Sequence, residues 1–173
     1  PQSTDSGGNL NWSFTDAKRY WVSSGVGLWS SAANWSRASG GTGGASVPSS
    51  THTVVFDGAN NRNGNAQINM TVTVPTMTIT GYTGNINTLG FNLTVSSAFY
   101  QSSGIVTIGT SVVTMGGDMI RTGGNFSTGI STIQFTGSMP QTLTSGATSF
   151  YHILVNKTAN TLTLGDNLAL VGQ

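Results

Sequence analysis

Short apolar runs recur in the second half of this chain at one constant spacing. The runs begin at Leu93, Val113, Ile133 and Ile153. Glycines repeat at the same interval, as the pairs Gly109 and Gly129, and Gly117 and Gly137. A fixed period of about 20 residues that holds two or three short strands is typical of a β-solenoid, or β-helix. The sequence therefore predicts an all-β fold whose coils stack with a rise of about 4.8 Å, so that residues one period apart become neighbours.

The composition fits such a coil. Gly, Thr, Ser and Asn account for 24, 26, 22 and 15 of the 173 residues. Thr suits the outward positions of a strand, and Gly and Asn supply the positive φ angles of tight corners. Apolar side chains then point inward, which predicts that Val113, Ile133 and Ile153 stack inside the solenoid. A β-sandwich or jelly roll is the alternative, but such a fold does not need a repeated, constant spacing.

By composition the chain divides into an N-terminal arm (1–15), an aromatic-rich capping segment (16–50) and a β-solenoid (51–173). All four Trp residues, which are Trp12, Trp21, Trp29 and Trp35, precede the periodic runs. Aromatic side chains on a β surface can stack on sugars, or they can cap the first coil, whose apolar interior is otherwise exposed. Because these residues precede the coils and do not recur once per coil, we interpret 16–50 as a cap.

Charge and hydropathy exclude several classes of function. The chain has six Lys or Arg residues, five Asp, no Glu and a net charge of +1. Nucleic-acid binding needs several bases on one face, and no basic cluster exceeds the pair Lys18-Arg19. A membrane-spanning helix needs about 18 consecutive apolar residues, and no apolar run in this chain approaches that length. The lack of Cys excludes disulfides and thiolate metal sites. We therefore expect no nucleic-acid partner and no membrane span.

Groups that could perform catalysis or bind a metal are sparse. A glycoside hydrolase needs two carboxylates about 5–9.5 Å apart. Asp57 and Asp118 lie about three periods apart in the sequence, or roughly 14 Å along the axis, and Asp166 lies at another phase of the period. His52 and His152 are separated by five periods, or roughly 24 Å, so they cannot share a metal ion or a catalytic triad. We predict no catalytic residue, no metal site and no cofactor, and hence no enzyme.

Residues 57–65 carry side-chain oxygens at alternate positions and have a faint likeness to a calcium-binding loop. The stretch runs from Asp57 to Asn65 and lacks the terminal Glu that completes such loops. A polar turn is the preferred interpretation, and calcium binding stays open.

Two stretches carry a family resemblance. The first is the succession Tyr20-Trp21-Val22, Gly27-Leu28-Trp29, Ala33-Asn34-Trp35-Ser36, Gly43-Gly44-Ala45-Ser46-Val47-Pro48 and Val54-Val55-Phe56-Asp57. The second is Ser131–Phe135, Gln141–Leu143, Phe150–Lys157 and Leu162–Leu164. Together they resemble secreted bacterial β-solenoid surface proteins, namely adhesins and autotransporter-passenger-like repeat proteins. The resemblance implies an extracellular or cell-surface location. His52 departs from it, because an acidic residue is expected there, and family members are usually far longer.

The two ends of the chain suggest how it assembles. Leu162–Val171 is apolar and alternating, and an open β edge of this kind invites another chain. Within the arm, Leu10, Trp12 and Phe14 alternate with polar residues, as in a strand with one buried face. This strand can close the first coil of its own solenoid or add to the open edge of a neighbour.

We therefore expect a structural extracellular protein, a subunit of a surface fibre or filament assembled head-to-tail with copies of itself. The candidate interface residues are Leu10, Trp12, Phe14, Leu162, Leu164, Leu168 and Leu170. The alternative is an adhesin or glycan-binding module of a longer surface protein, whose partner is a glycan or a host surface.

Overall fold

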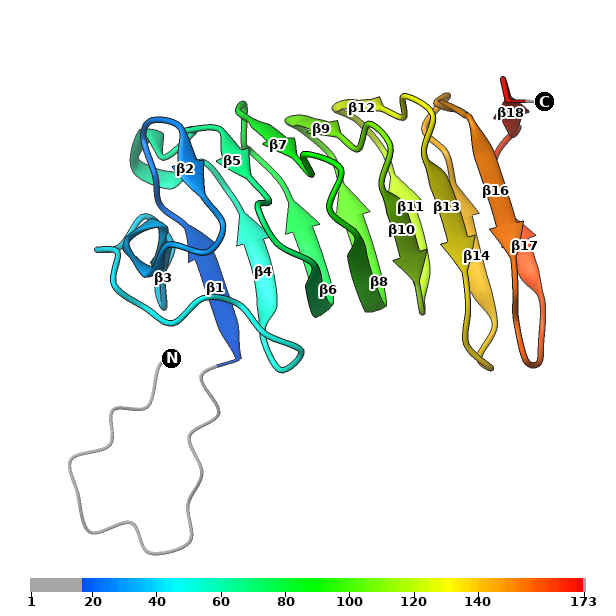
Figure 1. The fold of residues 1–173 in the computed structure, drawn as a ribbon, viewed down its shortest axis with the longest axis horizontal. Coiled ribbons are helices and arrows are strands. Elements are labelled where there is room, and N and C mark those ends of the chain that lie inside the picture. The colour runs from blue at the N-terminus through cyan, green and yellow to red at the C-terminus, as the bar shows by residue number, and fades with distance from the viewer. Residues whose placement is uncertain (1–16, 173) are drawn as a thin grey trace, which may run out of the picture.

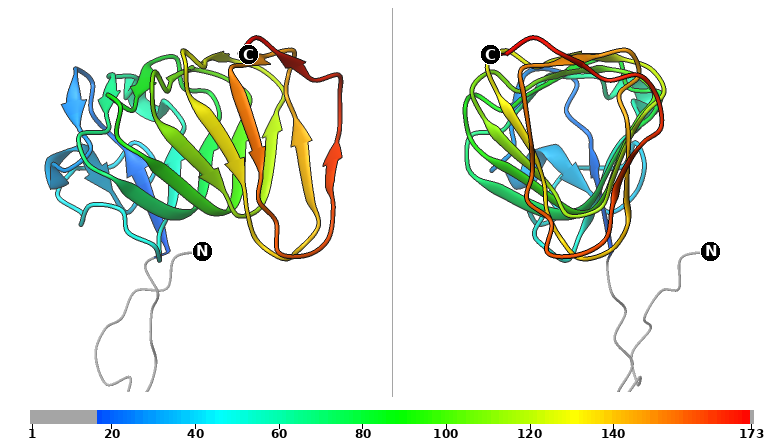
Figure 2. Two further views of the ribbon diagram at one scale, coloured as in Figure 1. Left: turned by 45° about the vertical axis from the view of Figure 1, so that its right-hand side comes forward. Right: turned by 90° about the vertical axis from the view of Figure 1, so that its right-hand side faces the viewer.

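The structure, a computed structural model, describes residues 17–172, which form a β-solenoid of about six coils (Figure 1). Seen along its axis, each coil has the outline of a rounded triangle (Figure 2). The predicted all-β solenoid with coils of about 20 residues is confirmed. The sandwich alternative is wrong, because adjacent strands of successive coils run parallel and only β1 and β3 pair antiparallel in the described part of the chain.

Three sheets make up the wall of the solenoid. The first contains β1 (Lys18–Trp21), β3 (Trp35–Ser36), β4 (Thr53–Phe56), β6 (Val72–Ile79), β8 (Leu93–Gln101), β10 (Val112–Met115), β11 (Asp118–Arg121), β13 (Thr132–Phe135), β14 (Gln141–Thr144), β16 (His152–Val155) and β17 (Leu162–Leu164). The second contains β2 (Gly27–Leu28), β5 (Ala66–Gln67), β7 (Asn85–Asn87), β9 (Ile105–Thr107) and β12 (Asn125–Ser127). The third pairs β15 (Ser149–Phe150) with β18 (Ala169–Leu170), and two short 3-10 turns are η1 (Ala32–Asn34) and η2 (Ala59–Asn61).

The register of the strands follows the sequence period. Val113 pairs with Leu93 on one side and with Ile133 on the other, and Ile133 pairs in turn with Ile153. Val113 and Ile133 are buried, and Ile153 is half-buried against the core. The predicted inward stack is therefore confirmed, and it becomes more exposed towards the C-terminal coil.

A buried aromatic cluster fills the N-terminal coils. Trp35 lies between the other two described tryptophans, with ring centroids 5.1 Å from Trp21 and 4.6 Å from Trp29. Phe56 stacks on Trp21 and also contacts Tyr82. The indole N–H of Trp21 donates to the Gly64 carbonyl, and that of Trp35 donates to the Trp29 carbonyl, both at 2.7 Å. Because these tryptophans are buried, they stabilise the core and do not form a platform for sugars.

One corner of the solenoid depends on glycine. Between β6 and β8 the register shifts at Pro75, opposite Ser96 and Ser97, and the next coil places Gly116 and Gly117 at the same corner. A Cβ atom on Gly117 would lie 1.5 Å from the carbonyl oxygen of Ser97. The repeated glycine at this phase therefore reflects close approach of the backbones of successive coils.

We expect Gly117→Ala to lower the free energy of unfolding by about 1–3 kcal/mol, because the added methyl group forces two coils apart. For a chain of this size the melting temperature falls by about 2–4 °C per kcal/mol. Thermal denaturation followed by circular dichroism measures the shift. Gly25→Ala is the matched control, since a Cβ atom there meets nothing within 4 Å; equal melting temperatures for the two variants would contradict the steric argument.

Candidate functional site

The C-terminal end of the solenoid has free strand edges. β16 pairs only with β13, β17 only with β14 and β18 only with β15 among the residues that the structure describes. No segment of residues 17–172 crosses the mouth of the last coil when it is viewed down the axis (Figure 2). The outer edges of these three strands therefore offer unpaired backbone groups to another strand.

The same end exposes the apolar interior of the coil. Phe135, Leu143 and Phe150 are buried and lie in register with the last members of their columns, which are Val155, Leu164 and Leu170. These last residues are 53%, 49% and 54% exposed. They occupy inward positions, so their exposure arises because no further coil within residues 17–172 covers them. Leu162 and Leu168 complete this surface and are half-buried against the core.

The opposite end is largely closed. β3 pairs antiparallel with β1 through Tyr20 and Trp21, and it lies at the N-terminal end of the solenoid (Figure 1). On the side of β3 away from β1, the Ala45 amide donates to the Trp35 carbonyl at 3.0 Å. Arg19 is buried beside it, and its guanidinium donates to the carbonyl and hydroxyl oxygens of Ser46. Among the described strands, β2 pairs with β5 only and exposes Leu28. The two ends are thus chemically different.

The predicted interface residues have different outcomes. Leu162, Leu164, Leu168 and Leu170 lie together at the open end. Leu10, Trp12 and Phe14 lie outside the described residues. Sequence reasoning missed Val155, although it lies one period after Phe135 and ends that column. The regular spacing of the repeat was the signal that could have identified it.

A buried guanidinium holds the last two coils against the preceding ones. Arg121 donates from Nε to the Gln101 side-chain oxygen at 2.8 Å, and from Nη1 to the Ser145 carbonyl at 2.5 Å and to the Thr148 hydroxyl. Its guanidinium carbon lies 4.9 Å from the centre of the Phe126 ring. Burial lowers the pKa of Arg121 to about 10, and attraction to Asp166 acts in the opposite direction, so the group is charged at neutral pH.

Asp166 attaches the segment between β17 and β18 to the coil beneath. Its carboxylate accepts hydrogen bonds from the Ser145 amide at 2.7 Å, the Ser145 hydroxyl at 2.9 Å and the Gly146 amide at 2.8 Å. The bond from the Ser145 amide is the main reason that the pKa of Asp166 lies below its usual value, and the other two act in the same direction. The ionised carboxylate therefore stabilises the open end.

The other described carboxylates also have structural partners. Asp57 accepts from the Ala59 amide, and Asp118 accepts from the Thr142 amide. Asp57 follows β4 and Asp118 begins β11. Strand pairing runs from β4 through β6 and β8 to β11. The two carboxylates are therefore three rungs apart, or about 14 Å along the solenoid axis. This exceeds the separation of about 5–9.5 Å in glycoside hydrolases. The pair does not form a hydrolytic site.

The histidines and the calcium-like loop show no shared site. His52 precedes β4 and His152 begins β16, five rungs later along the chain of pairings. In the loop, the side-chain oxygens of Asn63 and Asn65 accept hydrogen bonds from the next coil. The donors are the backbone amides of Thr83 and Asn85, respectively. Within residues 17–172 no three His, Cys, Asp or Glu side chains gather as metal ligands. These contacts favour the interpretation of a polar turn.

Comparisons with known proteins identify no relative. A scan against protein-family models, a search of curated proteins and a search of solved structures each return no match. Among residues 17–172, no helix is both long enough and apolar enough to cross a bilayer.

Proposed function

We propose that this protein is a structural subunit of an extracellular fibre, assembled head-to-tail by association of solenoid ends. The observation that carries the proposal is the difference between those ends. One is closed by β3 and the tryptophan cluster, and the other exposes Val155, Leu164 and Leu170 beside three free strand edges. A surface of this kind favours association, because it buries apolar area and pairs backbone groups at once.

Unlike ends give an open assembly. When a surface on one copy binds a different surface on the next, the contact does not close on itself, and repetition produces a filament. The near-zero net charge of +1 favours association further, because it provides little electrostatic repulsion between copies.

The proposed occupant of the open end is the N-terminal arm of a neighbouring copy. The alternation of Leu10, Trp12 and Phe14 supplies an apolar face on a short strand. Adding that strand to the edge of the last coil would satisfy its backbone groups and cover its exposed side chains. Closure of the arm on its own first coil, and coverage of the open end by further coils of a longer chain, are the rival arrangements.

The extracellular location is part of the same proposal. It is supported by the resemblance of the segments around Trp29 and Ile133 to secreted bacterial surface proteins. No feature of the described site depends on a cofactor or a second kind of subunit. The rival function, an adhesin or glycan-binding module of a longer surface protein, predicts monodisperse particles instead of filaments.

Deletion of residues 1–15 is expected to leave a folded solenoid that does not elongate. Electron microscopy and light scattering measure filament length, and circular dichroism confirms the fold. If the full chain forms filaments and the truncated chain forms equally long ones, the arm is not the donor. If the full chain gives only monodisperse particles, the fibre proposal is wrong.

A substitution at the acceptor end gives an independent test. We expect Leu164→Asp to shorten or abolish filaments, because it places a carboxylate in the apolar surface that the neighbour must cover. Leu89→Asp is the matched control: Leu89 is 47% exposed, as against 49% for Leu164, and lies in a turn far from either end. Equal loss of assembly in both variants would show that added charge alone prevents association.

A further inference from the structure

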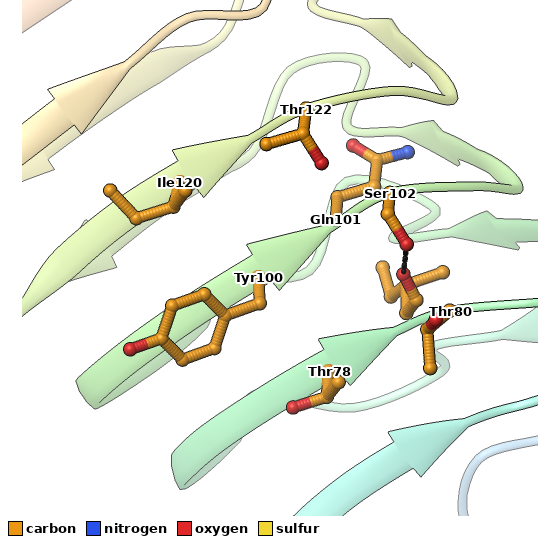
Figure 3. Close-up of a pocket in the computed structure, with 8 residues that line it drawn as sticks. Thr78, Thr80, Tyr100, Gln101, Ser102, Ile120 and Thr122 are labelled. Carbon is orange, nitrogen blue, oxygen red and sulfur yellow. Dashed lines mark hydrogen bonds between the residues drawn. The ribbon is translucent and has the colours of Figure 1, made fainter. Parts of the chain in front are cut away.

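A shallow hollow lies on the outer face of the solenoid, away from both ends. It spans three successive rungs, β6, β8 and β11 (Figure 3). One column across it consists of Thr78, Tyr100 and Ile120, which are in register. A second column, two residues further along the chain and just past the ends of these strands, consists of Thr80, Ser102 and Thr122. The parallel register thus creates a small grid from residues that lie about one period apart in the sequence.

The grid combines an exposed aromatic ring with a column of hydroxyl groups. Tyr100 is 42% exposed, and its ring projects from β8 with Thr78 and Ile120 on either side (Figure 3). The second column supplies three hydroxyl groups beside the ring. Ser102 donates to the Ile79 carbonyl at 3.4 Å, a long and weak bond. The hydroxyls of Thr80 and Thr122 make no hydrogen bond to another group of residues 17–172. No charged side chain lines the hollow.

We propose that this hollow binds a short stretch of a neutral polysaccharide. The apolar face of one sugar ring would stack on Tyr100, and Thr80, Ser102 and Thr122 would bond hydroxyl groups of that ring and of the units next to it. Threonine and serine hydroxyls both donate and accept, as sugar hydroxyls do. Because the rungs lie about 4.8 Å apart and the columns about 6.6 Å apart, the row of three hydroxyls extends over about 9.6 Å. This length exceeds one sugar ring and suits consecutive units of a chain. This proposal does not rest on the fibre.

The surroundings argue against other occupants. A peptide strand would need a free edge, but β6, β8 and β11 are each paired on both sides. A phosphate or an acidic ligand would need cations, and the lining has none. A neutral ligand with one apolar face and several hydroxyls fits both the ring and the hydroxyl column.

A single site of this kind binds weakly, but copies arranged along a filament act together. Successive subunits would present the same hollow at a regular interval on the same polysaccharide, which raises the effective concentration of each further contact. Measurements on the unassembled chain therefore test the site by itself. The variant lacking residues 1–15 serves the same purpose if the full chain polymerises.

The test is titration of the full chain with cellohexaose, mannohexaose and chitohexaose, followed by backbone amide NMR. We expect at least one hexasaccharide to shift the resonances of residues 78–80, 100–102 and 120–122. Tyr100→Ala is expected to weaken that binding about tenfold, equivalent to about 1.4 kcal/mol, while Tyr100→Phe keeps the stacking surface and most of the affinity. Phe91→Ala is the matched control, since Phe91 is also 42% exposed but lies outside the hollow.

Three results would overturn the proposal. The first is the absence of any shift in these resonances with all three sugars at millimolar concentration. The second is equal binding by Tyr100→Ala and the parent chain. The third is binding that shifts the resonances of other residues in place of these, such as those around Trp12. None of these outcomes affects filament formation, so failure of the sugar site and failure of the fibre proposal are distinguishable.

Discussion

Ile133→Asp is expected to remove most of the stability of the solenoid. Ile133 is 1% exposed and lies between Val113 and Ile153 in the inward stack. A carboxyl group at that position must bind a proton to stay buried, which costs about 4 kcal/mol at pH 7 from an ordinary Asp pKa near 3.9. Loss of the buried Ile adds about 2 kcal/mol. The total is comparable to the whole stability of many domains, about 5–15 kcal/mol.

The damage is expected to begin locally, because each coil of a solenoid contacts only its neighbours. The coils from β13 onward should lose structure first, while the buried cluster around Trp35 keeps its fluorescence. Urea denaturation followed by circular dichroism and by Trp emission separates the two regions. Gln134→Asp is the matched control, because Gln134 is the next residue of the same strand and faces outward. Parent-like melting of Ile133→Asp would show that the inward assignment is wrong.

The repeat made the coil predictable from sequence, and departures from the repeat limited the prediction. Val113, Ile133 and Ile153 recur once per period because residues in register share one environment. Leu143 could not be placed in the same way. It pairs with Met119, which lies more than one period earlier, because the turn around Pro140 lengthens that coil. A fixed spacing finds stacked columns only where the corners have equal length.

The closed end was predicted in part. The early tryptophans indicated a cap, and the three of them within the described residues, Trp21, Trp29 and Trp35, are buried. The antiparallel pairing of Trp35 with Trp21 was not predictable, because it depends on how the chain returns across the end of the coil. At the open end, the apolar alternation of Leu162, Leu164 and Leu170 was visible in the sequence. Their exposure was not, because an alternating strand looks the same whether or not another coil covers it.

The polar interior was missed altogether. Arg121 and Gln101 lie one period apart and occupy the inward position that Phe56 and Ile79 hold in the earlier coils. Charged residues are rarely buried without partners, so the sequence alone suggests an exposed side chain. The partners of Arg121 are carbonyl and hydroxyl oxygens of Ser145 and Thr148, which no pattern of side-chain types reveals.

Arg121→Ala is expected to be the second most damaging substitution. It should lower the free energy of unfolding by about 3–5 kcal/mol. It leaves the side-chain oxygen of Gln101 and the carbonyl of Ser145 without their charged donor in a buried site. Arg121→Lys should restore only part of the loss, because an ammonium group cannot reproduce the planar set of guanidinium donors. Arg37→Ala is the control, since Arg37 is exposed. Urea denaturation measures all three variants, and a loss for Arg121→Ala no larger than that of the control would contradict a structural role for the buried cation.

The attachment of the last coil should also depend on pH through Asp166. Its pKa in the folded chain is lower than its usual value, so the unfolded chain binds a proton first as the pH falls. The carboxylate therefore stabilises the fold above about pH 4, the ordinary Asp value, and this stabilisation is lost as the pH falls through the lower, folded-state pKa. Hydrogen exchange of the Ser145 and Gly146 amides should accelerate, relative to amides of the core strands, on acidification of the parent chain. In Asp166→Asn these amides should already exchange fast at neutral pH. Their exchange rate relative to the core amides should change little with acid, because the Asn side chain does not titrate. If the relative exchange of these amides responds to acid equally in Asp166→Asn and in the parent chain, another group causes the response. Asp166 then does not attach the open end.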